Sequence, residues 1–200
     1  MTQARNGLLT STLLVLTLSL LAVGSSASAT TYYLYEYVDG DGDTSACCIE
    51  FASDSFDVPS DTFDEVTLTE LENAGYKCAD DQISDANETD SENQGSRTGI
   101  SWIDFDRVGA RLYCYRGSQT ETQTTERVDV TSEYWCYDNQ GLRHHSKRSA
   151  VDYNGPMVNI WWRTKHNPPP YYSWVVQGTH KWAGTAFSYQ TNVEADEPEE

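Results

Sequence analysis

The stretch that decides the fold runs from residue 107 to residue 138 and reads RVGARLYCYRGSQTETQTTERVDVTSEYWCYD. Successive side chains of a strand point to opposite faces, so alternate residues share one face. On this spacing each half of the stretch gathers apolar residues and one cysteine: Val108, Ala110, Leu112 and Cys114 in the first half, and Val128, Val130, Tyr134 and Cys136 in the second. Residues 117–126 between them are rich in Ser, Thr, Gln and Glu, which is typical of an exposed loop. The stretch therefore predicts a β-hairpin whose apolar face carries a core.

Several short segments after residue 99 have the composition and length of strands. They are residues 100–105, 107–116, 125–137, 142–150, 157–163, 171–176 and 180–189. Turn-forming Asn, Asp and Gly residues separate some of them, at 138–141 and 152–156, and the proline run 168–170 forms a stiff loop. This spacing predicts a mainly β protein, an antiparallel β-sandwich of about seven strands over residues 100–190.

The region before the sandwich, residues 30–78, is acidic and contains predicted strands at 31–38 and 46–51 and one short helix within 60–75. Thr67 and Thr69 each stand three residues before a glutamate, as in a capping box, and Gly75 suits the end of the helix. Residues 79–99 are rich in Asp, Glu, Ser and Asn and predict an acidic linker without regular structure. Residues 191–200 predict a disordered acidic tail.

The first 29 residues have the features of a secretory signal peptide. An apolar run at 8–23 follows Arg5, and Ala27-Ser28-Ala29 has the A-x-A form of a cleavage site. The alternative is a membrane anchor, but the run is short for a bilayer span and the cleavage site favours removal. The sequence therefore predicts a secreted, extracellular protein with no membrane span after the signal is removed.

Charge divides the chain unevenly, within a formal net charge of −18. Residues 30–99 hold 18 acidic and 2 basic side chains, whereas residues 100–190 hold 8 acidic and 10 basic ones together with all four histidines. Two interpretations stay open: the acidic half packs on a basic face, or the acidity keeps the protein soluble, as in high salt. Such acidity argues against nucleic acid as a partner.

The strand end Tyr134-Trp135-Cys136-Tyr137-Asp138 resembles small secreted actinobacterial proteins of uncharacterised function. Those proteins carry a Trp-Cys-Tyr-Asp-Gly strand end followed by Trp- and Tyr-rich strands, and the likeness covers about residues 107–189. Here Asn139 and Gln140 separate Asp138 from the next glycine. The resemblance implies a secreted β-sandwich, and it implies no activity and no functional residue.

Five cysteines lie after the signal segment, and outside the cell they are expected to form disulfides. Cys114 and Cys136 both face the apolar side, and a bridge between them would close a loop of about twenty residues, worth roughly 3 kcal/mol. Simple hairpin register does not place them opposite each other, so the bridge requires facing sheets or a slipped register. Cys78 is then expected to pair with Cys48 or with Cys47.

Asp39, Asp41 and Asp43, with Glu50 at the twelfth position, have the oxygen-ligand spacing of a calcium loop. Thr44 stands where a calcium loop has its turn glycine, and a strand rather than a helix precedes the motif. The alternative is an acidic hairpin turn without a metal. Calcium is the one cofactor that the sequence suggests, and these four residues are its predicted ligands.

Aromatic residues of the last strands suggest a ligand-binding face. If Val158, Ile160 and Trp162 face the core, Asn159, Trp161 and Arg163 face outward, and Trp182 follows nearby in the sequence. Exposed aromatic rings flanked by polar donors can stack on sugar rings, which predicts a glycan-binding surface at Asn159, Trp161, Arg163 and Trp182. The alternative is that these tryptophans fill the core.

A basic cluster, Arg143, His144, His145, Lys147 and Arg148, lies within one predicted strand. Adjacent residues of a strand point to opposite faces, so His144 and His145 cannot readily share a metal. The cluster fits either an anion-binding face or a solvated outer face that balances the acidic half.

No catalytic motif is present: the sequence lacks a Gly-x-Ser-x-Gly elbow, a His-Glu-x-x-His pair and a phosphate loop. The leading hypothesis is therefore a secreted, non-catalytic β-sandwich protein that binds a glycan or another cell-surface ligand. One alternative is a structural or self-associating exoprotein in which the odd cysteine links chains. Another is an extracellular hydrolase whose Asp/His site matches no motif.

Overall fold

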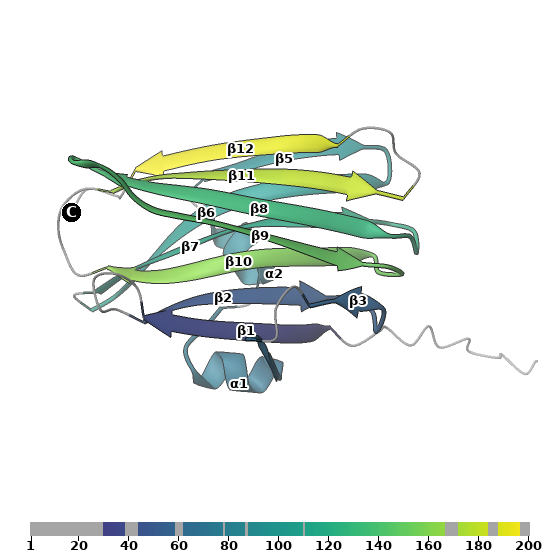
Figure 1. Ribbon diagram of the computed structural model, residues 1–200, viewed down its shortest axis with the longest axis horizontal. Helices are drawn as coiled ribbons and strands as arrows, with labels where there is room; N and C mark the ends of the chain where they lie inside the picture. The colour runs from purple at the N-terminus through teal and green to yellow at the C-terminus, as the bar shows by residue number, and fades with distance from the viewer. Residues whose placement is uncertain are drawn as a thin grey trace, which may run out of the picture.

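The computed structural model describes residues 30–38, 44–58, 62–77, 79–86, 88–109, 111–166, 172–183 and 188–196. These residues form two antiparallel sheets that pack face to face, with two short helices beside them (Figure 1). The predicted mainly β sandwich is therefore confirmed, although it contains more strands than expected and extends into both flanking regions.

The larger sheet has seven strands in the order β4-β1-β2-β10-β7-β6-β5. Their bounds are Thr31–Val38 (β1), Thr44–Phe51 (β2), Asp64–Val66 (β4), Glu88–Gln94 (β5), Arg97–Val108 (β6), Arg111–Thr122 (β7) and Met157–His166 (β10). β10 pairs with both β2 and β7, so it joins the N-terminal strands to the middle of the chain. The acidic N-terminal region is thus part of the sandwich rather than a separate unit.

The smaller sheet has five strands in the order β12-β11-β8-β9-β3. Their bounds are Phe56–Asp57 (β3), Val128–Asp138 (β8), Gly141–Asp152 (β9), Ser173–Trp182 (β11) and Tyr189–Asp196 (β12). β8 and β9 form a hairpin that carries a bulge between Cys136 and Tyr137. β3 is so short that it pairs only with Val151 and Asp152 of β9.

The outer face of the larger sheet is covered in part by the helices α1 (Leu68–Asn73) and α2 (Ala79–Asp85). The predicted capping box forms at the first of them, where Thr67 and Glu70 exchange side-chain and backbone hydrogen bonds. Gly75 follows with a φ of +78°, a left-handed conformation that suits glycine after a helix. Leu71 of α1 and Ala79 of α2 pack with Trp102 and Trp161 into a second, smaller core on this face.

The main core lies between the sheets and is apolar at most positions. Cys47, Ile49 and Phe51 of β2 belong to the same buried cluster as Val128 and Val130 of β8, together with side chains of β10 and β11. Burial of such side chains from both sheets is the principal force that holds a sandwich together. Part of this interior is polar instead, because Ser118 and Thr120 of β7 are also fully buried.

The predicted hairpin over residues 107–138 is wrong, because its two strands do not pair. β7 pairs with β6 and β10, whereas β8 pairs with β9 and β11 in the facing sheet. Residues 117–122 are not an exposed loop but the buried second half of β7. The hydroxyl groups of Ser118 and Thr120 have hydrogen-bond partners in the facing sheet, so a polar sequence was compatible with burial.

The predicted linker at residues 79–99 is also wrong, since this segment forms α2, β5 and the start of β6. β5 is polar because it is an edge strand whose side chains are mostly exposed, and its backbone pairs with β6 from Glu88 to Gln94. Likewise, residues 191–196 of the predicted tail belong to β12, while residues 197–200 and the signal segment 1–29 lie outside the described residues.

Candidate anion-binding pocket

The smaller sheet leaves part of the larger sheet uncovered on the side of β1 and β9. Alternation along β9 is fixed by its register with β8: His144 lies beside Cys136, Ser146 beside Tyr134, and Arg148 beside Ser132. Because those β8 residues face the interior, the three β9 side chains point toward the larger sheet. They are polar and only half-buried, so the two sheets do not close on each other at this point.

A pocket of about 380 Å³ occupies this position. Its lining residues come from four strands: Tyr35 and Tyr37 of β1, Tyr134 of β8, Trp162 of β10, and Arg143, His144, His145, Ser146 and Arg148 of β9. Among the described residues no aspartate or glutamate lines it. The pocket therefore combines aromatic walls with cationic and hydroxyl groups, in a protein that is strongly acidic overall.

The basic side chains around the pocket differ in whether they already have a carboxylate partner. Arg143 forms an ion pair with Asp138 at 2.6 Å, and His145 and Lys147 both contact Glu133, at 2.7 and 2.8 Å. Arg148 instead donates to the backbone oxygen of Lys147 at 3.0 Å and has no carboxylate partner in the part of the chain that the structure describes. Arg148 is thus the side chain whose positive charge remains available to a ligand.

The aromatic walls are held in place by contacts between rings. Tyr35 and Tyr37 stack with their centres 5.6 Å apart, and Tyr134 meets Trp162 edge to face at 5.0 Å. Burial, together with the neighbouring Tyr134, raises the pKa of Tyr37, so its hydroxyl stays protonated and can donate a hydrogen bond. Such rings offer a flat, apolar surface beside the guanidinium of Arg148.

A second guanidinium lies behind the wall of the pocket. Arg116 of β7 is 0% exposed, and its guanidinium carbon lies 3.9 Å from the centre of the Tyr134 ring and 4.2 Å from that of Trp174. It donates to Thr164 Oγ1 at 2.6 Å and to the oxygen of Cys114 at 3.1 Å. No carboxylate among the described residues neutralises it, so its charge adds to the positive potential on this side of the sandwich.

The predicted glycan-binding residues do not form an exposed surface. Trp161 is 0% exposed, and its indole N–H donates to the buried carboxylate of Glu50 at 2.7 Å, to which Asn159 also donates at 3.3 Å. Arg163 lies on the same outer face, stacked over Tyr76 and Tyr113. The helices and the segment that joins them cover this face, which is why outward-pointing side chains are buried there.

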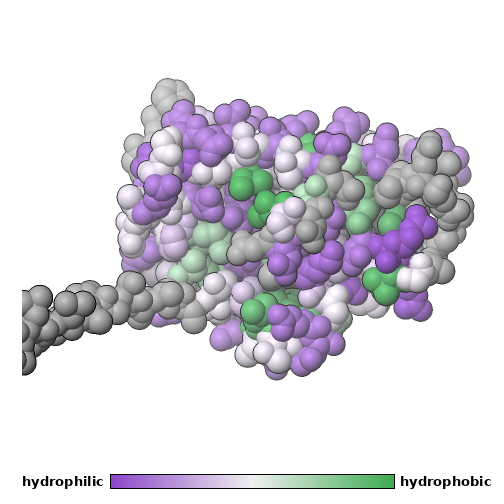
Figure 2. All heavy atoms as spheres, turned by 180° about the vertical axis from the view of Figure 1, so that it is seen from behind, coloured by the Kyte–Doolittle hydropathy of each residue, from purple (hydrophilic) through white to green (hydrophobic). Residues whose placement is uncertain are grey.

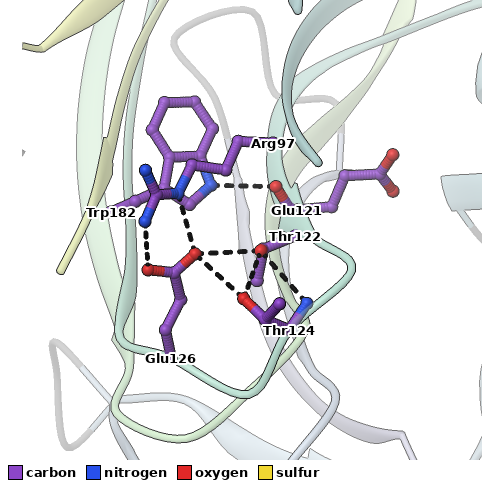
Figure 3. A network of polar contacts seen from close by, with 6 residues as sticks. All are labelled: Arg97, Glu121, Thr122, Thr124, Glu126 and Trp182. Atoms are coloured by element: carbon purple, nitrogen blue, oxygen red, sulfur yellow. Dashed lines mark hydrogen bonds and ion pairs between the residues drawn. The ribbon is translucent and has the colours of Figure 1, made fainter. Parts of the chain in front are cut away.

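Trp182 lies apart from these residues, between the sheets, and is 4% exposed. Figure 3 shows its indole N–H directed at the backbone oxygen of Glu121, at 2.8 Å, next to the ion pair of Arg97 with Glu126. Trp161 therefore lies on the outer side of the larger sheet and Trp182 on its inner side, so the two cannot bind one ligand. On the side opposite to the view of Figure 1, hydrophilic residues dominate the surface and hydrophobic ones lie in small separate patches (Figure 2).

The predicted calcium site stays a prediction, because three of its four ligands lie outside the described residues. These three are Asp39, Asp41 and Asp43, and the fourth ligand, Glu50, lies opposite Tyr32 in the β1–β2 pairing. Glu50 lies six residue steps along the extended strand from Thr44, a distance of about 20 Å. Glu50 instead accepts hydrogen bonds from Trp161, Asn159 and the backbone N–H of Ala79. No group of potential metal ligands gathers among the described residues.

The disulfide pairing stays a prediction, since the four described cysteines carry free thiols in this structure. Cys47, Cys48, Cys114 and Cys136 are buried and carry thiols, and Cys78 lies outside the described residues. Cys48 faces the outer core, whereas Cys47, Cys114 and Cys136 face the core between the sheets. The condition stated for a bridge between Cys114 and Cys136, that their strands lie in facing sheets, is met.

A polar network that the sequence did not reveal crosses the interior. Thr120 and Thr191 contact the two ring nitrogens of His180, each at 2.8 Å, and Thr191 continues through Ser101, Ser118 and Ser132 with distances of 2.7 to 2.8 Å. All six side chains are buried, so the network links the sheets rather than forming an accessible site. Its signal was the spacing of Ser118, Thr120 and Thr122 at every second residue.

The pocket was foreseen only in part. The sequence indicated the basic cluster and the opposite directions of His144 and His145, and His145 does lie on the outer face, stacked on Trp135. It missed Tyr35, Tyr37, Tyr134 and Trp162, although Tyr33, Tyr35 and Tyr37 alternate in the first strand. Nothing in the sequence places that strand opposite the basic cluster.

Comparisons with known proteins do not add a functional assignment. No protein-family model matches the chain, and no curated protein matches it. None of the helices that the structure describes is long and apolar enough to cross a membrane.

Proposed function

We propose that this protein is a secreted, non-catalytic binding module whose ligand is an acidic molecule, held in the pocket between β1 and β9. The observation that carries the proposal is the half-buried guanidinium of Arg148, which has no carboxylate partner among the described residues and stands beside stacked tyrosine rings. A charge that is partly removed from water is costly unless it is paired, so the site favours an anion.

The glycan hypothesis is kept here for acidic carbohydrates alone. Its predicted surface at Trp161 and Trp182 is buried, but the pocket offers tyrosine rings for stacking together with donors for an acidic group. An acidic carbohydrate, with a carboxylate or sulfate on the ring, would satisfy both. A neutral sugar would leave the guanidinium without a partner, and we do not expect it to bind.

Titration calorimetry with acidic probes tests this proposal. We expect an oligogalacturonate or a glutamate-rich peptide to bind the mature protein, and binding to weaken as sodium chloride is raised. Arg148→Gln should lower the affinity at least tenfold, whereas Lys181→Gln, which removes an exposed charge from β11 away from the pocket, should leave it unchanged. Absence of binding by every acidic probe would overturn the proposal.

Secretion is part of the proposal and is tested separately. Expression in a bacterial host with a general secretion pathway should place the protein outside the cytoplasm. Its first residue should then be Thr30, because cleavage follows Ala29. N-terminal sequencing that finds Met1 on the exported protein would contradict this.

A further inference from the structure

The pocket lies next to an incomplete edge of the smaller sheet. β3 covers β9 only at Val151 and Asp152, and no other described strand pairs with that side of β9 along residues 142–149. In the larger sheet β4 pairs with β1 only from Tyr32 to Leu34. One more strand in line with β3 would extend the smaller sheet over the tyrosines of β1, where the pocket now lies.

An added strand would meet different charges on its two faces. On the outer face Lys147 already has a carboxylate partner, because Glu133 contacts both Lys147 and His145. On the inner face Arg148 retains its charge, and Ser146 and the tyrosine walls add donors. Since strand residues alternate between faces, the fitting strand carries acidic residues at every second position, directed into the pocket.

We propose that the ligand is an extended acidic polypeptide that adds to the edge of β9 as a further antiparallel or parallel strand. This inference rests on the proposed function and names the class of its ligand. Main-chain hydrogen bonds along β9 supply binding that does not depend on sequence, and the pocket selects acidic side chains. About eight residues, roughly 26 Å of strand, match the length of the edge.

A second copy of β9 does not fit this edge. Two β9 strands paired side by side would bring arginine, lysine and histidine side chains against one another, and no acidic residue occurs between Gly141 and Val151. Like charges on paired strands are destabilising. The partner is therefore a different, acidic segment.

The test compares peptides that differ only at the backbone. The probe is an eight-residue peptide that alternates threonine and glutamate, blocked at both ends. Two further peptides of the same sequence carry N-methyl groups at the odd or at the even positions, which removes the N–H groups along one edge of the strand. Titration calorimetry measures affinity, and amide hydrogen exchange measures protection of residues 142–149.

We expect the unmethylated peptide to bind, one methylated peptide to bind comparably, and the other to bind at least tenfold more weakly. Binding should slow exchange along residues 142–149, and Arg148→Gln but not Lys181→Gln should weaken it. Equal binding by both methylated peptides, or binding without protection of β9, would overturn strand addition. If an oligogalacturonate binds and no peptide does, this inference fails while the proposed function stands; if nothing acidic binds, both fail.

Discussion

At the scale of single residues, His180 is the clearest departure from an apolar core. It is fully buried between two threonine hydroxyls, and Gly99 and Gly178 leave room for its ring: a Cβ added at Gly178 would lie 2.5 Å from His180 Nε2 and from Ser101 Oγ. Neither threonine can balance a positive charge. Both ring nitrogens are thus satisfied by neutral partners, which suits the uncharged imidazole.

This arrangement predicts a loss of stability at acidic pH. Burial lowers the pKa of His180 to about 4, below the value of about 6.5 of an exposed histidine. The unfolded state therefore binds the proton first, so the contribution of neutral His180 is complete above pH 6.5 and is lost as the pH falls toward 4. At pH 5 the loss is about 2 kcal/mol of unfolding free energy.

Urea unfolding at pH 7 and pH 5 measures this effect, with His180→Gln as the reference. Glutamine keeps a donor and an acceptor but does not titrate in this range. The variant should be less stable than the parent at pH 7 and should lose about 2 kcal/mol less on going to pH 5. An identical pH dependence in the two proteins would contradict the assignment.

At the scale of elements, Glu50 joins the larger sheet to the helix above it. Its carboxylate accepts from Trp161 Nε1 of β10 at 2.7 Å and from the backbone N–H of Ala79, the first residue of α2, at 3.3 Å. Hydrogen bonds to a buried carboxylate are stronger than neutral ones. Seven residues are too few for a helix to be stable alone, so α2 depends on such contacts.

Glu50→Gln is therefore expected to destabilise the protein by about 1–3 kcal/mol and to speed amide exchange in α2, because the amide presents an N–H₂ group where donors converge. Denaturant unfolding with exchange mass spectrometry measures both. Glu72→Gln, on the exposed surface of α1, is the matched control and should change stability by less than about 0.5 kcal/mol. Equal stability of the two variants would refute the anchoring role.

The strands β7 and β8 bring Cys114 and Cys136 into the same core from facing sheets. Burial raises the pKa of Cys136, as it raises that of Cys47 to about 12, so the folded thiols are poor nucleophiles. We predict that a bridge between Cys114 and Cys136 forms when the chain folds in an oxidising buffer, but not when the folded, reduced protein is oxidised later. Peptide mapping of both samples decides this, and a peptide joining Cys78 to either cysteine would contradict the pairing.

Sequence patterns predicted correctly the elements whose apolar residues or capping residues recur at a clear spacing. They failed where the structure or burial of a segment depends on the strand that pairs with it or faces it. The strand at residues 31–38 was predicted with its observed bounds, and the Thr67–Glu70 box located α1. β5 was missed, because an edge strand of polar residues gains its structure from the backbone of β6. The second half of β7 was missed because the burial of Ser118 and Thr120 depends on hydrogen-bond partners in the facing sheet, Ser132 of β8 and His180 of β11.

At the scale of the whole molecule, the net charge of −18 acts against compact folding. We predict that the melting temperature rises by several degrees as sodium chloride increases from 0.05 to 0.5 M, and rises little beyond that, because the screening length falls from more than 10 Å to a few ångströms over this range. Calorimetric scans measure it. A flat response, or a gain that keeps rising linearly above 0.5 M, would point away from charge screening.

The two long margins of the sandwich are closed to different degrees. On one margin β12 lies against β5, where the backbone N–H of Asn192 donates to Asp90 Oδ2 at 2.7 Å. On the other, the pocket separates β9 from β1. We therefore expect local opening to start at the margin between β9 and β1. Water should then reach the thiol of Cys47 and the guanidinium of Arg116 well before β5 and β12 separate. The two sheets would then separate at the β1–β9 margin and stay in contact at the β5–β12 margin, which acts as the hinge.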